Sequence, residues 1–347
     1  MRIFSYRNKR LLRRIILITL AALVLLALLI AARISYLGRF VVYSPDGVYL
    51  DTQQHLSRSD VPSASQPEDA DYPFETVFSD GTQDEQADTA VLLHGYYIST
   101  TMLADSVDTV RHALNETDDY NAVLIDVKSP LGNFYYSTDI DGAQTADADI
   151  SACDALIQEL TGRSDLVVIA RVPAFSDPNF IGKHYSAALT TTSGELWMDS
   201  RRCYWMRPDS IDAQSYLSAI ALELDTLGFD EVLFDNFYVP DDSSVRWDTE
   251  ALTRTAALEE CAEKLQADLT GSSIRLALGT STASVAQYAS RVFITTERAN
   301  DVMNITQSMS EVLSDPVTQL VFVTTSHDTR FDDAGVIRPL LGGDNTD

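Results

Sequence analysis

The chain has 347 residues, enough for one large domain or two small ones. Hydrophobic residues make up 45% of it and there are only 3 cysteines, so the chain can bury a sizeable core and is neither collagen-like nor a disulfide scaffold. Its 51 acidic residues outnumber its 25 Lys and Arg residues, and the net charge of −26 repels nucleic acid, so we expect no nucleic-acid partner.

The first predicted element is a transmembrane helix over residues 15–32. This run is apolar except for Thr19, and as a helix it would span about 27 Å, near the thickness of a bilayer's hydrocarbon core. Most nearby basic residues precede it, which predicts a cytoplasmic N-terminus, a single-pass anchor in the cell membrane and an extracytoplasmic body. A cleaved signal peptide usually has a shorter apolar region, and a buried core helix would not need the flanking arginines, so the anchor is the favoured interpretation.

Two short segments are predicted between this anchor and the main domain. Residues 40–52 should form a β-hairpin, because two β-rich runs flank the turn sequence Ser44-Pro45-Asp46-Gly47. Residues 53–88 are rich in Ser, Asp, Gln and Pro and are expected to be an acidic linker. Residues 1–14 and 342–347 are expected to be tails, the first of them basic and cytoplasmic.

Residues 89–341 alternate apolar runs with amphipathic helical patterns. The runs predicted as strands are 91–98, 122–127, 166–170, 231–234, 274–278, 292–295 and 320–324, with 335–341 as a candidate for an eighth. The segments predicted as helices are 99–114, 151–160, 210–227, 249–269 and 302–313. This alternation indicates a parallel sheet covered on both faces, and its length suits a (β/α)8 TIM-like barrel. The alternative is an open doubly wound sheet, which often begins with a glycine-rich phosphate turn that this sequence lacks.

Charged residues follow several of the predicted strands, where a barrel of this type carries its functional groups. They are Asp126, Lys128, Arg171, Asp235, Glu297 and Asp328. Carboxylates gathered on one rim repel one another unless they hold protons or a cation, and sugar-cleaving barrels use such pairs as acid and as nucleophile or base. We therefore predict a catalytic set of Asp235, Glu297 and Asp126, with no metal and no cofactor.

Each predicted catalytic residue has an expected role. Asp235 should stay ionised as nucleophile or base, because Arg171 ends a neighbouring strand. Glu297 should be the protonated acid, on a strand expected to lie across the barrel mouth. Asp126 should orient substrate hydroxyls or Asp235. The structural alternative for all three acids is a cap or an ion pair with a nearby basic residue.

Further residues near the strand ends are predicted to bind substrate. The aromatic candidates for stacking on sugar rings are Tyr96, Trp197, Trp205 and Tyr238, and the polar candidates are Arg171, Lys128 and Asp328. The expected partner is a polysaccharide or cell-wall glycan. The alternative for the aromatic residues is that they belong to the hydrophobic core.

Three stretches resemble a bacterial family of "putative glycoside hydrolases" with a TIM-barrel domain and otherwise unknown function. The first is 121–128 with Gly132 just beyond it, where the family has Asp-Val-Lys followed by Gly. The second is 168–178, an Ala-Arg strand that leads to a Phe-x-Asp-Pro turn. The third begins at Trp197-Met-Asp199 and ends in 227–240, a Gly-Phe-Asp-Glu strand followed by Phe-Asp and a terminal Pro. Together they cover about residues 90–240, and the resemblance implies a barrel that cleaves glycosidic bonds.

The sequence also departs from that family. Asn236 and Tyr238 stand where the family commonly has Tyr and Arg, and Arg207 stands where it commonly has an acid. Beyond residue 270 little of the family pattern remains, and Phe293-Ile-Thr-Thr-Glu297 stands in place of its sixth-strand motif. The second half of the barrel is therefore expected to be degenerate.

Two functions remain open at this point. The first is a membrane-anchored glycoside hydrolase that acts on cell-envelope or exported polysaccharide. The second is a catalytically inactive barrel that binds glycan or an envelope protein. Two free carboxylates at an open cleft would favour catalysis, whereas capture of both acids by Arg171 or Lys128 would favour binding.

Overall fold

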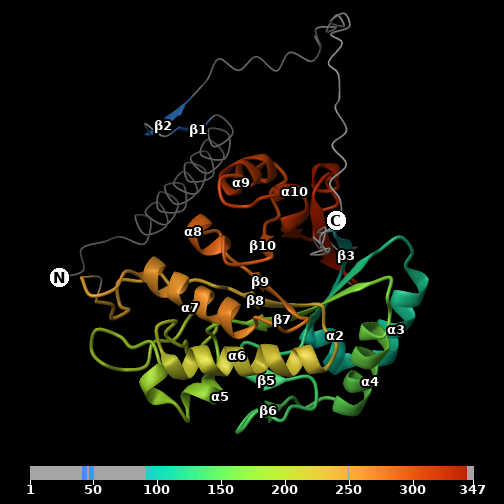
Figure 1. The fold of residues 1–347 in the computed structure, drawn as a ribbon, viewed down its shortest axis with the longest axis horizontal. Helices are drawn as coiled ribbons and strands as arrows, with labels where there is room; N and C mark the ends of the chain where they lie inside the picture. Colours follow the sequence, from blue (N-terminus) through green and yellow to red (C-terminus); the bar gives the residue numbers. More distant parts are fainter. Residues whose placement is uncertain (1–40, 45–46, 51–90, 249, 342–347) are drawn as a thin grey trace, which may run out of the picture. The chain divides into compact units, whose positions relative to one another are not determined.

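The computed structural model describes residues 41–44, 47–50, 91–248 and 250–341 (Figure 1). The chain forms two compact units, residues 1–83 and 84–347. In the first, β1 (Val41–Ser44) pairs with β2 (Gly47–Leu50) as an antiparallel hairpin. The predicted transmembrane segment, the predicted linker and the C-terminal tail lie outside the described residues. Within the part of the chain described, no helix is both long and apolar enough to cross a membrane.

The second unit is a closed barrel of eight parallel strands. These are β3 (His94–Ile98), β4 (Ala122–Asp126), β7 (Val167–Pro173), β8 (Glu231–Asp235), β9 (Arg275–Leu278), β10 (Arg291–Thr295), β11 (Leu320–Val323) and β12 (Gly335–Pro339). Neighbours in space follow the chain order, and β12 closes the barrel by pairing with β3. The predicted (β/α)8 barrel is confirmed, with its eighth strand in the candidate segment, and the open sheet is excluded.

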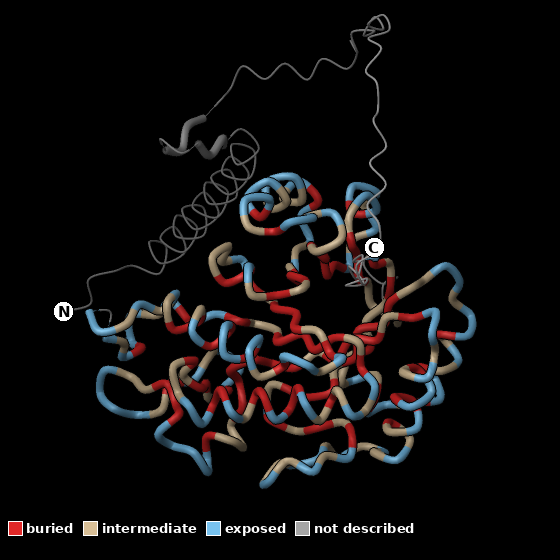
Figure 2. The backbone as a smooth tube through the Cα atoms, in the orientation of Figure 1, coloured by how far each residue is buried: buried red, intermediate tan, exposed pale blue. Residues whose placement is uncertain are grey.

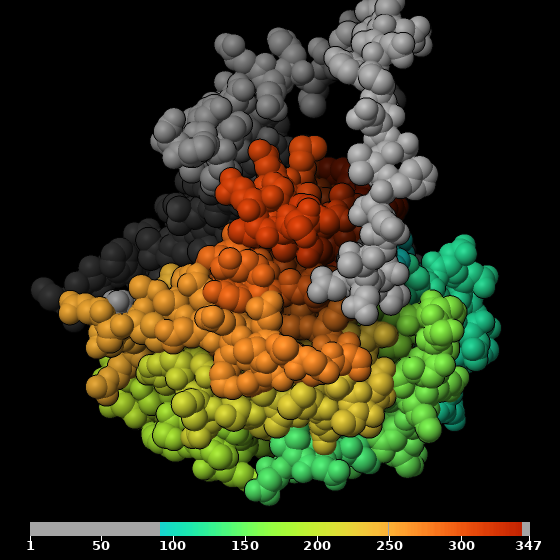
Figure 3. All heavy atoms as spheres, in the orientation of Figure 1, coloured from blue at the N-terminus to red at the C-terminus, as the bar shows by residue number. Residues whose placement is uncertain are grey.

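The connections between these strands carry the helices. They are α2 (Thr100–Asp105), α3 (Val107–Glu116), α4 (Ile150–Thr161), α5 (Pro178–Ile181), α6 (Ile211–Thr226), α7 (Arg254–Asp268), α8 (Ala283–Ala286), α9 (Asp301–Met309) and α10 (Pro316–Gln319), with the 3-10 turns η2 (Tyr185–Ala187) and η3 (Thr329–Phe331). The loop after β4 adds the short pair β5 (Asn133–Phe134) and β6 (Gln144–Thr145). Helices α6 and α7 lie side by side over the barrel on the side that Figure 3 shows.

Capping residues explain where the helices begin. Ser210 caps α6 by accepting a hydrogen bond from the backbone N–H of Ala213, so this helix begins within one residue of the predicted segment 210–227. The helix predicted over 99–114 is instead two helices, because Ser106 adopts extended backbone and its hydroxyl caps α3. Helix α7 begins after Thr253, a few residues later than predicted, because the Thr253 hydroxyl accepts the hydrogen bond that starts it.

The barrel core follows the two-residue period of its strands, in which alternate side chains point to the same face. One set of buried apolar side chains fills the interior, among them Leu124, Ile169 and Leu233. The other set packs outward against the helices, so the strands and the inner faces of α6 and α7 are buried (Figure 2). The three cysteines are buried and free.

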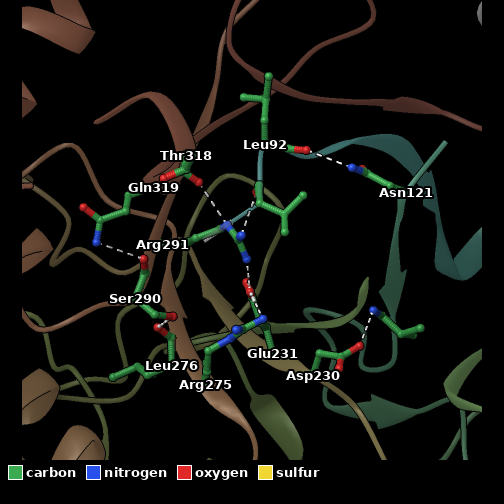
Figure 4. Close-up of polar contacts among 12 residues, drawn as sticks. Leu92, Asn121, Asp230, Glu231, Arg275, Leu276, Ser290, Arg291, Thr318 and Gln319 are labelled. Carbon is green, nitrogen blue, oxygen red and sulfur yellow. Dashed lines mark hydrogen bonds and ion pairs between the residues drawn. The ribbon is translucent and has the colours of Figure 1, made fainter. Parts of the chain in front are cut away.

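The amino end of the barrel is closed by an ion network around Glu231 (Figure 4). Glu231 is fully buried and pairs with Arg291 and, at 3.0 Å, with Arg275. Arg291 also donates to the carbonyl oxygens of Val91 (2.8 Å) and Thr318 (3.1 Å). Burial raises the pKa of Glu231, and the two arginines oppose that shift. This end is therefore occupied by structural contacts, which leaves the carboxyl end for a functional site.

Candidate active site at the carboxyl end of the barrel

Three charged side chains reach the barrel mouth from consecutive strands. Asp126, Arg171 and Asp235 each lie two residues beyond an interior apolar residue, on β4, β7 and β8. Because side chains two residues apart point to the same face, all three project inward at the carboxyl end. The register places Asp126 beside Arg171 and Asp235 beside Pro173. The sequence prediction that these residues gather at one rim agrees with this geometry.

The Arg171 guanidinium binds the Asp126 carboxylate in a bidentate ion pair. Its Nε donates to Oδ1 and its Nη2 donates to Oδ2 at 2.8 Å. The guanidinium also lies 5.2 Å from the ring centroid of Tyr97, which is a cation–π contact. Asp126 is therefore neutralised by Arg171, and it holds the arginine at the centre of the mouth.

Asp235 is half-buried and is held by the residue that follows it. The Asn236 backbone N–H donates to its Oδ1 at 2.8 Å, and the Asn236 side chain donates to its Oδ2 at 3.2 Å. Asn236 has φ 55°, in the left-handed region that asparagine tolerates. Burial raises the pKa of Asp235 above its ordinary value, although the nearby charge of Arg171 acts in the opposite direction.

A cavity of about 200 Å³ opens beside the Asp235 carboxylate. Its walls come from the end of β8, from β10 and from the segments that follow β8 and β9, and they include Tyr238, Gly279, Phe293 and Thr295. A Cβ atom at Gly279 would lie 2.6 Å from Asp235 Oδ1, so only glycine leaves room for the carboxylate there. The Tyr238 side chain, 43% exposed, lines the same cavity. The arrangement is a carboxyl group at the edge of an open, partly aromatic hollow.

Glu297 lies two residues beyond the end of β10 and is held by the end of β11. Its carboxylate accepts hydrogen bonds from the hydroxyls of Thr324 (3.1 Å) and Thr325 (2.7 Å) and from the Thr325 backbone N–H (3.1 Å). Burial acts to raise its pKa, but these hydrogen bonds outweigh burial and hold the pKa below the usual value.

One expectation for the carboxylates is wrong, and another stays a prediction. Only β9 separates β8 from β10 in the closed barrel, so the strand of Glu297 does not lie across the mouth from Asp235. The pKa of Asp235 is raised and that of Glu297 is lowered, so Asp235 is better suited than Glu297 to donate a proton, and the catalytic roles of the two residues stay predictions. The physical reason is that Asp235 is the drier of the two, while Glu297 sits among hydroxyl donors.

Two other predicted substrate ligands are engaged in structural contacts. Lys128 is 2% exposed and pairs with the buried Asp177 at 2.8 Å, and Tyr216 donates to the same carboxylate at 2.8 Å. Asp328 caps η3 and pairs with Arg330, which holds the pKa of that carboxyl below its usual range. In these positions Lys128 stabilises the loop after β4, and Asp328 stabilises the loop after β11.

Two of the four predicted aromatic residues are buried, and the other two are partly exposed. Trp197 and Trp205 are buried with their rings edge to face, and Trp205 lies 5.2 Å from the ring of Tyr238. Tyr96 points away from the mouth and packs against Tyr120. The residue that reaches the mouth on β3 is Tyr97, which the predicted set of substrate-binding residues leaves out in favour of Tyr96. The two-residue period counted from Leu93 could have identified it, because Leu93 lies in the barrel interior.

The described residues contain no group of three or more His, Cys, Asp or Glu side chains that could hold a metal ion. Taken together, the mouth offers one carboxyl with a raised pKa, one with a lowered pKa, an arginine and an open cavity. Such a set suits acid–base chemistry on a hydroxylated substrate.

Several solved structures are similar to this chain. A hypothetical protein from Ruminiclostridium thermocellum ATCC 27405 is 23% identical, with a TM-score of 0.45, and the match covers 52% of this chain and 96% of that one. Aspergillus fumigatus Ega3, solved with galactosamine, is 13% identical, with a TM-score of 0.46 and coverage of 74% and 95%. The glycoside hydrolase domain of PelA from Pseudomonas aeruginosa is 14% identical, with a TM-score of 0.42 and coverage of 71% and 94%.

No curated protein matches the sequence significantly. A family model does match, over residues 95–321, which run from the first barrel strand into the seventh. The match includes Asp126, Arg171, Asp235 and Glu297, and it extends to residue 321, well beyond residue 270, where the sequence motifs of the family become sparse. On this evidence the chain belongs to the family described as "Putative glycosyl hydrolase domain".

Proposed function

We propose that the barrel hydrolyses glycosidic bonds, with Asp235 as the general acid and Glu297 as the ionised carboxylate. The observation that carries this proposal is the different surroundings of two carboxyl groups on strands separated only by β9. Asp235 is half-buried beside the cavity, which raises its pKa, whereas Glu297 accepts hydrogen bonds from Thr324 and Thr325, which lower its pKa. When two carboxyl groups in one site have different pKa values, one can supply a proton while the other supplies a negative charge at the same pH. Glycoside hydrolysis requires both.

The proposed chemistry follows from the contacts at the mouth. A sugar bound in the cavity beside Tyr238 presents its glycosidic oxygen to protonated Asp235. The proton moves to that oxygen as the carbon–oxygen bond breaks, and Glu297 stabilises the positively charged sugar ring as nucleophile or activates the attacking water as base. Arg171, fixed by Asp126 and Tyr97, orients substrate hydroxyls.

Removal of either carboxyl group tests this assignment. Asp235→Asn and Glu297→Gln should each lower kcat on a cleaved polysaccharide by about 10²-fold or more, because a positioned acid or base contributes about 10²–10⁴-fold. Release of reducing ends from cell-wall and exported polysaccharides is the measurement. The matched control is Asp328→Asn, which removes a carboxylate that caps η3 and should leave kcat within about twofold.

The pH dependence is the second readout. Glu297 must be ionised and Asp235 protonated, so kcat/KM should fall on the acid side as Glu297 takes up a proton. It should fall on the alkaline side as Asp235 loses one. Asp235→Asn should remove the alkaline limb of any residual activity. A variant that cleaves as fast as wild type would make Asp235 a structural residue.

We also propose that residues 15–32 anchor the barrel on the outer side of the cell membrane, where it acts on envelope or exported polysaccharide. This proposal rests on the apolar run and the preceding basic residues. Protease added to intact cells should remove the acidic body. Complete protection of the body would contradict the proposal.

A second candidate is an inactive barrel that binds glycan. The capture of Asp126 by Arg171 favours it, because one of the three rim carboxylates is already neutralised. Wild type and Asp235→Asn would then bind the same glycans on an array with equal affinity, and neither would release reducing ends.

A further inference from the structure

A second and larger hollow lies on the loops that follow β7 and β8. It has a volume of about 760 Å³, and its walls include Tyr185, Thr190, Arg207, Arg246, Trp247 and Asp248. We call it the loop groove. Both loops leave the carboxyl ends of their strands, which is the end of the barrel where the Asp235 cavity lies. Helix α5 begins in the loop that follows β7 (Figure 1).

Backbone contacts hold the two walls of the loop groove together. The N–H of Arg246 donates to the Thr190 carbonyl at 2.7 Å, and Thr191 forms a β-bridge with Val245. On the first loop, the N–H of Arg207 donates to the Ala187 carbonyl at 2.7 Å. These contacts fix the walls before any ligand arrives, which reduces the entropy that binding would cost.

Two planar side chains form one wall and are themselves fixed. The Arg207 guanidinium lies 4.8 Å from the ring centroid of Trp247, and it donates to both carboxylate oxygens of Asp209 at 2.9 and 2.6 Å. The Trp247 indole N–H donates to the Leu252 carbonyl at 2.7 Å. The wall therefore presents a rigid stack of an indole and a guanidinium.

The remaining lining combines an exposed ring with balanced charge. Tyr185 is 58% exposed, a large aromatic side chain whose ring faces solvent at the groove. The positive charges of Arg207 and Arg246 are matched by the negative charges of Asp209 and Asp248. The groove thus offers rings and hydrogen-bonding groups without a net charge that would select an ion.

We propose that the loop groove is an accessory subsite that binds uncharged sugar units of a polysaccharide. As a subsite of the enzyme it rests on the function proposed above. Aromatic rings stack on the C–H faces of sugar rings, and planar Arg and Asp groups hydrogen-bond to hydroxyls. A ligand site typically combines aromatic walls with a few placed polar groups in this way. The open groove suits a section of a polymer chain.

Affinity electrophoresis of the full chain in detergent tests the proposal. The background variant is Asp235→Asn, so that the polymer stays intact during the run. Gels contain a neutral polymer (dextran, galactomannan or xylan) or the anionic polymer polygalacturonate. At least one neutral polymer should retard the protein, and Tyr185→Ala and Arg207→Gln should each weaken that retardation about tenfold.

The chain offers a matched control in Arg163→Gln. Arg163 also lies over an aromatic ring, Tyr120 at 5.5 Å, and pairs with the aspartate two residues on, Asp165. It precedes β7 and so lies at the opposite end of the barrel from the loop groove. This variant should keep full retardation. Retardation by polygalacturonate alone, by none of the polymers, or unchanged in the groove variants would overturn the proposal.

The same proteins separate this inference from the proposed hydrolysis. If wild type binds a neutral polymer through Tyr185 and Arg207 but cleaves none, the hydrolase proposal fails and the groove remains a glycan site. If wild type cleaves a polymer, and Tyr185→Ala cleaves it with unchanged KM and retardation, the groove proposal fails alone.

Discussion

At the scale of single residues, the environment of a carboxyl group decides its chemistry. Asp235 and Glu297 are both acids near strand ends, yet burial raises the pKa of Asp235 whereas threonine donors lower that of Glu297. Asp126 has the same position on its strand as Asp235, but Arg171 neutralises it. Of these three acids, Asp235 and Glu297 are the ones that we propose for proton transfer and charge stabilisation.

The raised pKa of Asp235 predicts that this residue destabilises the folded protein at neutral pH. The native state holds the Asp235 proton more tightly than the unfolded state, so stability falls as pH rises from the unfolded pKa toward the folded one. Asp235→Asn should therefore be more stable than wild type at pH 7, by about 1.4 kcal/mol for each unit by which the pKa is raised. The difference should vanish below the unfolded pKa, about 3.9. Thermal unfolding as a function of pH measures it.

Asp328→Asn is a control of opposite sign. Arg330 lowers the pKa of Asp328, so its ionised form favours the folded state and the variant should be slightly less stable than wild type at pH 7. That deficit should shrink as pH falls through the lowered pKa. If both variants shifted stability in the same direction, the assignment for Asp235 would be wrong.

At the scale of elements, the loops that follow the strands are shaped by buried polar contacts. The loop after β4 turns at Gly132, which has φ +82° and lies against the carboxylate of Asp177. That carboxylate is itself held by Lys128, by Tyr216 and by the N–H of Phe180 at the start of α5. The loop after β4 and the loop after β7 are thus joined through one buried aspartate.

This contact predicts the effect of Gly132→Ala. A Cβ atom there would lie 2.1 Å from Asp177 Oδ1, and the three partners of Asp177 prevent it from moving away. Left-handed backbone alone costs roughly 1–2 kcal/mol for a residue with a Cβ, and the clash adds to that. The free energy of unfolding of the variant, measured with urea, should therefore be lower than that of wild type by more than about 2 kcal/mol.

Gly194→Ala isolates the backbone contribution. Gly194 has φ +89°, and a Cβ atom there would meet nothing within 4 Å. The Gly194→Ala variant should lose only the roughly 1–2 kcal/mol of unfolding free energy that left-handed backbone costs a residue with a Cβ atom. Equal losses in the two variants would show that Asp177 does not confine the loop.

At the scale of the whole molecule, the two ends of the barrel carry different sets of charged side chains. The amino end holds the Glu231 network, and the carboxyl end holds the Asp235 cavity and the loop groove. Both sets of charges lie on inward positions of barrel strands, and β8 carries a member of each set, Glu231 at its start and Asp235 at its end. Side chains can therefore change at one end with little effect on the other.

Glu231→Ala tests this separation. It leaves Arg291, whose side chain is 3% exposed, without its buried carboxylate, and breaking such a pair costs about 3–5 kcal/mol. Chemical denaturation should show that loss, while kcat per folded molecule stays unchanged. The control is Glu263→Ala, an exposed position on α7 that should stay within about 0.5 kcal/mol of wild type. A stable Glu231→Ala with reduced kcat would contradict the separation.

Much of the fold was predictable from local pattern. Continuous apolar runs identified the strands, and the apolar period of residues 210–227 identified α6, because burial of a strand or of one helix face leaves a signal within a few residues. The break at Ser106 was missed because two short amphipathic helices in succession resemble one longer helix. The site was predictable only as a set of strand ends.

The sequence by itself determined that buried strands alternate with amphipathic helices and that Asp126, Arg171 and Asp235 lie at strand ends, because strand period and helix period are local properties. Tertiary structure decided that the sheet closes into a barrel instead of staying open. Tertiary structure decided that Arg171 binds Asp126, that Lys128 is buried against Asp177, and that Tyr97 rather than Tyr96 faces the mouth. It also decided that Asp235 is the drier carboxyl. Ion pairing, burial and pKa depend on residues that are distant in sequence, so no local pattern contains them.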